Sequence, residues 1–153
     1  MPEIVIRDYQ PEYRKYFESL NREWLEKLFT VEPIDELYFR DPEGQILKKD
    51  GEIFFAELDG QIVGTCSLLW DEGHLEMAKM GVTEKAKGRG VGEALVIEAI
   101  KRAKKKNISK LTLLTNSKLV PAINLYKKMG FRQIPLGSVK YARGDVMMER
   151  DLT

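Results

Sequence analysis

The chain has 153 residues, 43% of them hydrophobic and 32% charged, with a formal net charge of +1. This length and composition predict one globular domain over residues 1–153 with a sizeable core, and the balanced charge argues against a nucleic-acid partner. The single cysteine, Cys66, excludes an internal disulfide and fits a reducing compartment. No apolar run is long enough to span a membrane and the first ten residues lack a secretion-signal pattern, so we expect a cytoplasmic protein without a membrane partner.

Charge is distributed unevenly along the chain. Residues 1–79 hold 18 acidic and 9 basic side chains, whereas residues 80–153 hold 6 acidic and 16 basic ones. Some of the later cations lie in the last turn of a predicted helix, where their charge complements the helix dipole. The remaining asymmetry favours an anionic ligand over the second half and a cationic one near the first half.

The first half is predicted to contain one long helix, one short helix and four strands. Residues 3–8 form a short strand, and a helix starts near Pro11, its apolar stripe being Tyr13, Phe17, Leu20, Trp24 and Leu28. Residues 30–50 are polar and irregular, with a short helix capped by Asp41 before Pro42.

An antiparallel hairpin follows, with strands at 52–58 and 61–70 around the Asp59-Gly60 turn. Within it, Cys66 lies in an apolar strand and is expected to be a buried structural thiol. Residues 74–82 are the next strand. Gly81 inside it predicts a bulge or a close backbone approach.

The second half alternates between helices and strands. A helix is predicted from about Gly92 to Lys106, a strand at 110–115, and a second helix that ends at Gly130. Late strands follow at 131–134 and 145–152. The order of elements indicates an α/β domain with helices packed on a mixed sheet.

The loop between strand 74–82 and the helix after it has the sequence KGRGVGEAL, residues 87–95. It is not a dinucleotide fingerprint, because Glu93 stands where the third glycine belongs, and it is not a P-loop, because no G-K-[ST] ends it. Backbone N–H groups at 89, 90, 92, 93 and 94 can nevertheless converge on an anion at the helix N-terminus. The loop therefore predicts a pyrophosphate site.

Two motifs resemble the GCN5-related N-acetyltransferase (GNAT) superfamily. Residues 87–92, KGRGVG, resemble its pyrophosphate-binding signature, with Lys87 where Gln or Arg is usual. Residues 116–131, NSKLVPAINLYKKMGF, resemble its second motif and match it at Leu125-Tyr126 and Gly130-Phe131, although Leu119 replaces a common Asn. The segment AKMGV, residues 78–82, occupies the place of the strand along which the family binds the pantetheine arm of its cofactor.

The resemblance implies a mostly antiparallel, mixed sheet of six to seven strands flanked by about four helices. It implies acetyl-CoA as co-substrate, no metal, and a small amine or protein amine as acceptor. The residues that it assigns to cofactor binding are Met80, Val82, Lys87, Gly88, Arg89, Gly90, Val91, Gly92, Glu93 and Asn116.

The resemblance further implies direct attack of the amine in a ternary complex, so that positioning supplies much of the rate. The backbone N–H of Val82 or a neighbour polarises the thioester carbonyl. Tyr126 returns a proton to the thiolate, unless its ring only fills the apolar stripe of its helix. Glu76 accepts the ammonium proton directly or through water, and His74, the single histidine, is the alternative base.

The acceptor pocket is expected to draw on the first helix, residues 30–40 and the last hairpin. Its candidate residues are acidic or aromatic, which suits a small cationic amine: Glu32, Asp35, Glu36, Tyr141 and Glu149. The alternative function is a CoA-binding sensor without turnover, favoured by Leu119 and the lack of an evident base. The late strands are suited to pairing in a homodimer, although nothing in the sequence requires one.

Overall fold

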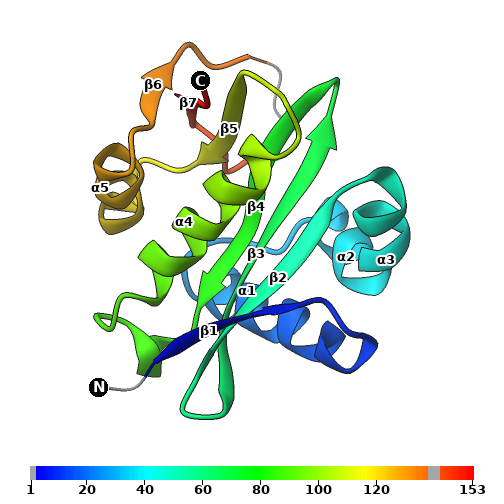
Figure 1. Cartoon of the computed structure of the whole chain (residues 1–153). Helices are drawn as coiled ribbons and strands as arrows, with labels where there is room; N and C mark the ends of the chain where they lie inside the picture. Colours follow the sequence, from blue (N-terminus) through cyan, green and yellow to red (C-terminus); the bar gives the residue numbers. More distant parts are fainter. Residues whose placement is uncertain (1–2, 138–141) are drawn as a thin grey trace.

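The computed structural model describes residues 3–137 and 142–153. A seven-stranded sheet runs through it in the order β1-β2-β3-β4-β5-β7-β6 (Figure 1). Only the β4–β5 pair is parallel, and the other neighbours are antiparallel. The strands are β1 (Ile4–Asp8), β2 (Glu52–Leu58), β3 (Gln61–Asp71), β4 (His74–Val82), β5 (Lys110–Thr115), β6 (Arg132–Ile134) and β7 (Val146–Asp151). The expectation of a mixed, mostly antiparallel sheet is confirmed.

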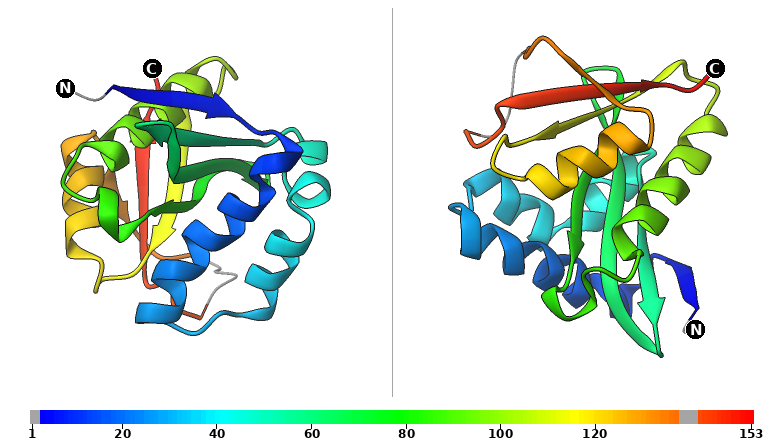
Figure 2. Two further views of the ribbon diagram at one scale, coloured as in Figure 1. Left: turned by 90° about the horizontal axis from the view of Figure 1, so that it is seen from below. Right: turned by 90° about the vertical axis from the view of Figure 1, so that its left-hand side faces the viewer.

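Helices cover both faces of this sheet. Figure 2 shows α1 and α2 on one face and α4 and α5 on the other. Residues 3–137 and 142–153 contain five α-helices, one of them a single turn: α1 (Arg14–Leu28), α2 (Pro33–Arg40), α3 (Pro42–Gln45), α4 (Val91–Lys104) and α5 (Val120–Lys128). Short 3-10 turns lie at Pro11–Tyr13, Leu47–Lys49 and Glu84–Ala86. None of the helices within the described residues is long and apolar enough to cross a membrane.

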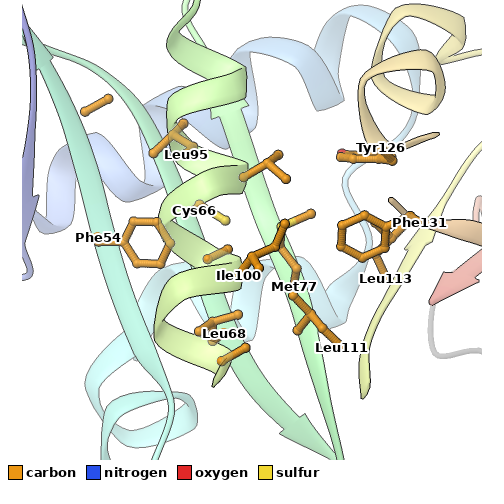
Figure 3. Packing of buried hydrophobic residues seen from close by; sticks show 14 of the residues in the cluster. Phe54, Cys66, Leu68, Met77, Leu95, Ile100, Leu111, Leu113, Tyr126 and Phe131 are labelled. Carbon is orange, nitrogen blue, oxygen red and sulfur yellow. The ribbon is translucent and has the colours of Figure 1, made fainter. Parts of the chain in front are cut away.

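Each face of the sheet has its own hydrophobic cluster. On the α4 side, Leu95 and Ile100 of the helix pack over Phe54, Cys66, Leu68 and Met77 of the sheet (Figure 3). On the α1 side, the buried residues are Phe17, Leu25, Phe39, Ile46, Ile53, Phe55 and Leu69. Burial of one such side chain contributes about 1.5–3 kcal/mol, so both helical layers are held chiefly by this apolar contact. Cys66 is fully buried, as expected.

The segment 30–50 contains more regular structure than we expected. The prediction of an irregular segment is wrong for residues 33–40, which form α2. Pro33 starts this helix, and a capping box joins Glu32 and Asp35, two carboxylates in place of the more common Ser or Thr and Glu. The predicted cap of α3 is confirmed, because the Asp41 carboxylate accepts a hydrogen bond from Gly44 N at 3.0 Å.

The centre of the sheet opens between β4 and β5. In the described chain the two strands pair only at Glu76↔Thr112 and Met77↔Leu113, so the later part of β4 runs on without β5 (Figure 1). In the same stretch the β3–β4 register shifts, and Cys66 of β3 lies opposite both Lys79 and Met80. The structure therefore has a β-bulge in β4 just before Gly81, where the sequence predicted a bulge or a close backbone contact.

Gly81 also has the predicted close backbone contact. A Cβ at this position would lie 2.6 Å from the carbonyl oxygen of Leu20 in α1, which is too close for any side chain. The glycine thus lets α1 pack directly on β4, beside the bulge.

Candidate active site

A cavity of about 530 Å³ fills the opening between β4 and β5. Its walls come from the end of α1, the bulged part of β4, the glycine loop, the end of β5 and the start of α5. Arg143 and Gly144, which precede β7, complete it. Of the residues predicted for cofactor binding and catalysis, all but Arg89 and the alternative base His74 line this one cavity.

The glycine loop leads into the N-terminus of α4 in a left-handed conformation. Gly88 and Gly90 have φ of 79° and 83°, and among the described residues no atom lies within 4 Å of a Cβ built at either position. The loop therefore leaves open space over its backbone, where an anion can approach. The 3-10 turn before it is held by Glu23 of α1, whose carboxylate accepts hydrogen bonds from Thr83 Oγ1 at 3.0 Å and Glu84 N at 2.8 Å.

The first turn of α4 supplies the amide donors. The N–H of Ala94 donates to Gly90 O at 3.0 Å, so our expectation that this amide points at an anion is wrong. The amides of Val91, Gly92 and Glu93 precede the first helical hydrogen bond and have no intrahelical acceptor. The helix dipole adds to their attraction for a phosphate.

The two loop cations lie at the surface. Lys87 Nζ is 3.3 Å from a Glu84 carboxylate oxygen, and Arg89 is 3.8 Å from Asp59. Both side chains are about half exposed, at 57% and 46%. Arg89 borders a separate groove beside the β2–β3 turn instead of the cavity.

Tyr126 extends from α5 into the cavity wall. Its ring packs edge-on against Phe131 with centroids 6.0 Å apart, and only 8% of the residue is exposed. Burial, with a smaller contribution from Cys66, raises the pKa of Tyr126 above its ordinary value. The phenol therefore stays protonated at neutral pH and can donate its proton.

The backbone of β4 turns two amides toward the opening. Thr83 N donates to Val63 O of β3 at 2.9 Å, and Val82 and Gly81 lie opposite Gly64 and Thr65. Because N–H directions alternate along a strand, the amide of Val82 points away from β3, toward the side where β5 has diverged, and we infer the same direction for Met80, which belongs to the bulge. Both residues line the cavity.

Glu76 and Asn116 lie where β4 and β5 separate. Glu76 is 8% exposed, lines the cavity and sits opposite Thr112. Asn116 also lines the cavity, and its amide nitrogen donates to Arg143 O at 2.7 Å while its oxygen accepts from Lys118 N at 2.8 Å. His74 is exposed at the start of β4, outside the cavity lining.

A buried ion cluster lies against the same cavity. Arg143 donates to both carboxylate oxygens of Asp35, at 2.8 and 2.7 Å, and also to Glu32 at 3.2 Å. The Lys79 ammonium donates to Asp35 as well. Lys79 and Arg143 line the cavity, whereas Asp35 is fully buried behind them. Although burial opposes it, the Arg143 and Lys79 charges lower the pKa of Asp35 to about 2.

The acidic acceptor pocket that we expected is not formed. In the described chain, Glu32 and Asp35 are paired with cations, Glu36 pairs with Arg22, and Glu149 pairs with Arg132 and Lys110. None of these carboxylates is among the described residues that line the cavity, and Tyr141 lies outside the described residues. Trp24, Lys79 and Arg143, which we did not predict, line it instead. The one feature of the sequence that could have indicated these residues is Lys79, a lysine inside the otherwise apolar segment AKMGV.

Known proteins resemble this chain in sequence and in fold. A family model described as Acetyltransferase (GNAT) family matches residues 7–131. The uncharacterized N-acetyltransferase YvbK of Bacillus subtilis is 30% identical over 106 residues, which are 64% of this chain and 68% of YvbK. Two other curated relatives are much longer, since the matched parts cover only 17% and 34% of them.

Solved structures are similar over nearly the whole chain. A GNAT-family acetyltransferase of Staphylococcus aureus Mu50 has a TM-score of 0.87 at 23% identity, covering 99% of this chain and 100% of that one. The PaiA N-acetyltransferase of Thermoplasma acidophilum, solved in complex with coenzyme A, has a TM-score of 0.76 at 20% identity, covering 97% and 99%.

Proposed function

Since the chain belongs to the acetyltransferase (GNAT) family, we propose that it moves the acetyl group of acetyl-CoA to a primary amine in a ternary complex. One observation carries the proposal. A single cavity is bordered by a left-handed glycine loop at a helix N-terminus, a strand with outward-turned amides, and a protonated tyrosine. These groups match the pyrophosphate, the thioester and the leaving thiolate of acetyl-CoA in turn.

In this proposal the cofactor lies along the opening between β4 and β5. The amides of Val91, Gly92 and Glu93 hold the pyrophosphate, with Gly88 and Gly90 leaving room for it. The pantetheine arm follows β4 past Met80 and Val82. Asn116 shapes the far wall through its hydrogen bonds to the backbone.

The reaction follows from these positions. The neutral amine attacks the thioester carbonyl carbon, a C–N bond forms, and the C–S bond breaks as the tetrahedral intermediate collapses. The amide of Val82 or of its neighbour Met80 stabilises the oxyanion. Glu76 takes the proton from the amine, directly or through water, and Tyr126 protonates the departing thiolate. The products are the amide and the CoA thiol, and Tyr126 regains its proton from solvent.

The acceptor is proposed to be either a small amine or an amine carried by a protein. It enters on the side bordered by Trp24, Lys79 and Arg143, where apolar and charged groups alternate. Carboxylates on this side are already paired with cations. The acidic composition of the first half indicated a cationic acceptor. Because these carboxylates are already paired, a simple polycation fits this side of the cavity less well than that composition indicated.

Calorimetric titration with acetyl-CoA, with ATP and NAD as controls, tests the proposal. Saturable binding of acetyl-CoA alone is the expected result, and release of the CoA thiol should then depend on an added amine from a panel of small amines and peptides. Lack of acetyl-CoA binding would overturn the proposal. Binding with no thiol release for any amine would instead support a CoA-binding sensor.

A further inference from the structure

The bulge in β4 is built on a residue that does not favour its conformation. Lys79 has a φ of 52°, in the left-handed region. Lys79 and Met80 together face the single residue Cys66 on β3, and in bulges of this kind the left-handed position normally belongs to glycine. A lysine at this position needs other interactions to hold its backbone.

The side chain of Lys79 supplies such interactions. It is 3% exposed, and its ammonium donates to the Asp35 carboxylate. The same ammonium lies 5.2 Å from the ring centroid of Tyr38 and 5.6 Å from that of Phe39, both on α2. These contacts anchor the bulge to α2 on the face of the sheet that α1 and α2 cover.

Asp35 is itself fixed by groups other than Lys79. Its carboxylate accepts hydrogen bonds from both terminal nitrogens of Arg143, at 2.8 and 2.7 Å, and from Glu32 N at 2.9 Å in the capping box of α2. Paired donors of this kind hold a carboxylate in one orientation. Asp35 is therefore a rigid partner that keeps its position whatever residue stands at 79.

The residues that follow the bulge are those whose amides face the cavity. Met80 is the next residue after Lys79, and Val82 lies two residues further along the strand. A change of φ at Lys79 rotates the strand that follows it, and therefore redirects both amides. The direction of the predicted oxyanion donors thus depends on the backbone conformation of one lysine.

We propose that Lys79 is a positioning residue: its ion pair with Asp35 holds the left-handed bulge and thereby sets the direction of the Met80 and Val82 amides, one of which donates to the thioester carbonyl. The inference rests on the proposed use of acetyl-CoA. It gives the buried charge of Lys79 a role in the backbone geometry of the site and none in direct contact with the reacting atoms.

Three variants separate this role from a charge effect. Lys79→Gly, Lys79→Asn and Lys79→Ala all remove the ammonium, but the left-handed conformation is easiest for Gly, less so for Asn and hardest for Ala. The readout is the infrared stretch of a ¹³C-labelled acetyl carbonyl in bound acetyl-CoA, which moves to lower frequency when the carbonyl accepts hydrogen bonds. This measurement needs no acceptor amine.

In the wild type the carbonyl band should shift to lower frequency on binding. Lys79→Gly should keep most of this shift, Lys79→Asn part of it, and Lys79→Ala little. Turnover of any accepted amine should fall in the same order, by about tenfold or more for Lys79→Ala, since loss of one oxyanion donor costs 10²–10³-fold. If Lys79→Ala does not fold, the Gly and Asn variants still give the order.

Asp59 offers a matched control, because it too is a left-handed non-glycine residue, with a φ of 53° in the β2–β3 turn. Asp59→Ala should lower stability without changing the carbonyl band. Equal shifts in all three Lys79 variants, whether kept or lost, would overturn the inference. Failure of the wild type to bind acetyl-CoA would instead overturn the proposed function on which it rests.

Discussion

The glycine loop and the ion cluster border the same cavity, but they are built from different kinds of interaction. The loop segment, residues 87–95, is contiguous in sequence and presents backbone amides at a helix N-terminus. The ion cluster consists of Glu32, Asp35, Lys79 and Arg143, and its bonds join side chains from positions 44 and 108 residues apart. Its members come from the start of α2, from β4 and from the chain before β7, and of these four Lys79 and Arg143 line the cavity.

This difference explains what each region can recognise. Backbone amides in an open loop bind a phosphate whatever side chains surround it, so the cofactor end is tolerant of side-chain changes. Buried charges are sensitive to the loss of any partner, because the remaining charge is left uncompensated. We therefore expect backbone-directed substitutions to affect the loop and charge-directed ones to affect the cluster.

Asp35→Asn should have the largest effect. Removing the charge from the centre of the cluster should cost roughly 3–5 kcal/mol of unfolding free energy at pH 7, measured with denaturant. Glu36→Gln on the same helix is the control, since its ion pair with Arg22 is half-exposed and should contribute less than about 1 kcal/mol.

The pH dependence of that difference follows from the pKa of Asp35. Folding lowers this pKa from about 3.9 to about 2. The stabilisation is therefore fully present above about pH 4 and is lost as the pH falls toward 2. A difference between wild type and Asp35→Asn that stays constant over this range would show that the carboxylate charge is not the stabilising feature.

Tyr126→Phe tests the predicted proton donor in the wall of the cavity that both regions border. The ring contact with Phe131 remains while the hydroxyl is lost, so kcat should fall roughly 10²–10³-fold with little change in the Kd of acetyl-CoA. Since burial raises the pKa of Tyr126, ionisation of this residue should not reduce wild-type activity up to about pH 10. If kcat of the variant equals that of the wild type at all pH values, Tyr126 is not the proton donor.

Glu76→Gln should lower kcat roughly 10²-fold and leave acetyl-CoA binding unchanged, as expected for a base that contacts the acceptor. His74→Gln provides the control on the same strand, because His74 is exposed and lies outside the cavity lining. If His74→Gln loses activity and Glu76→Gln does not, His74 is the general base and Glu76 is not.

Gly90→Ala should raise the Kd of acetyl-CoA about tenfold, because alanine disfavours the left-handed conformation and its Cβ occupies space over the loop. Gly60→Ala is closely matched, with a φ of 76° and similarly open surroundings among the described residues. It should lose comparable stability, roughly 1 kcal/mol, with no change in Kd. Equal Kd values for the two variants would exclude the loop as the pyrophosphate site.

Lys87→Gln should have the smallest effect, a change of less than about threefold in the Kd of acetyl-CoA. The side chain is 57% exposed and paired with Glu84, and such surface charges contribute little. A loss of tenfold or more would show that the loop depends on this cation in addition to its backbone.

Features that depend on neighbouring residues could be predicted from the sequence. The glycine spacing at 88, 90 and 92, the helix that follows, and the bulge near Gly81 are all in the structure. The helix at 33–40 was missed although its capping residues are local, because Glu32 and Asp35 form an unusual version of the capping box.

Features that depend on distant residues could not be predicted. Asp35 and Glu32 were predicted to line the acceptor pocket, but they pair with Lys79 and Arg143 behind the cavity, which removes the expected acidity of the pocket. An ion pair depends on the distance between two charges in space, which sequence spacing does not give for residues 44 or 108 positions apart. Local backbone preference thus set the glycine loop, whereas only the packing of α2 and the chain before β7 against β4 decided which charges face the cavity.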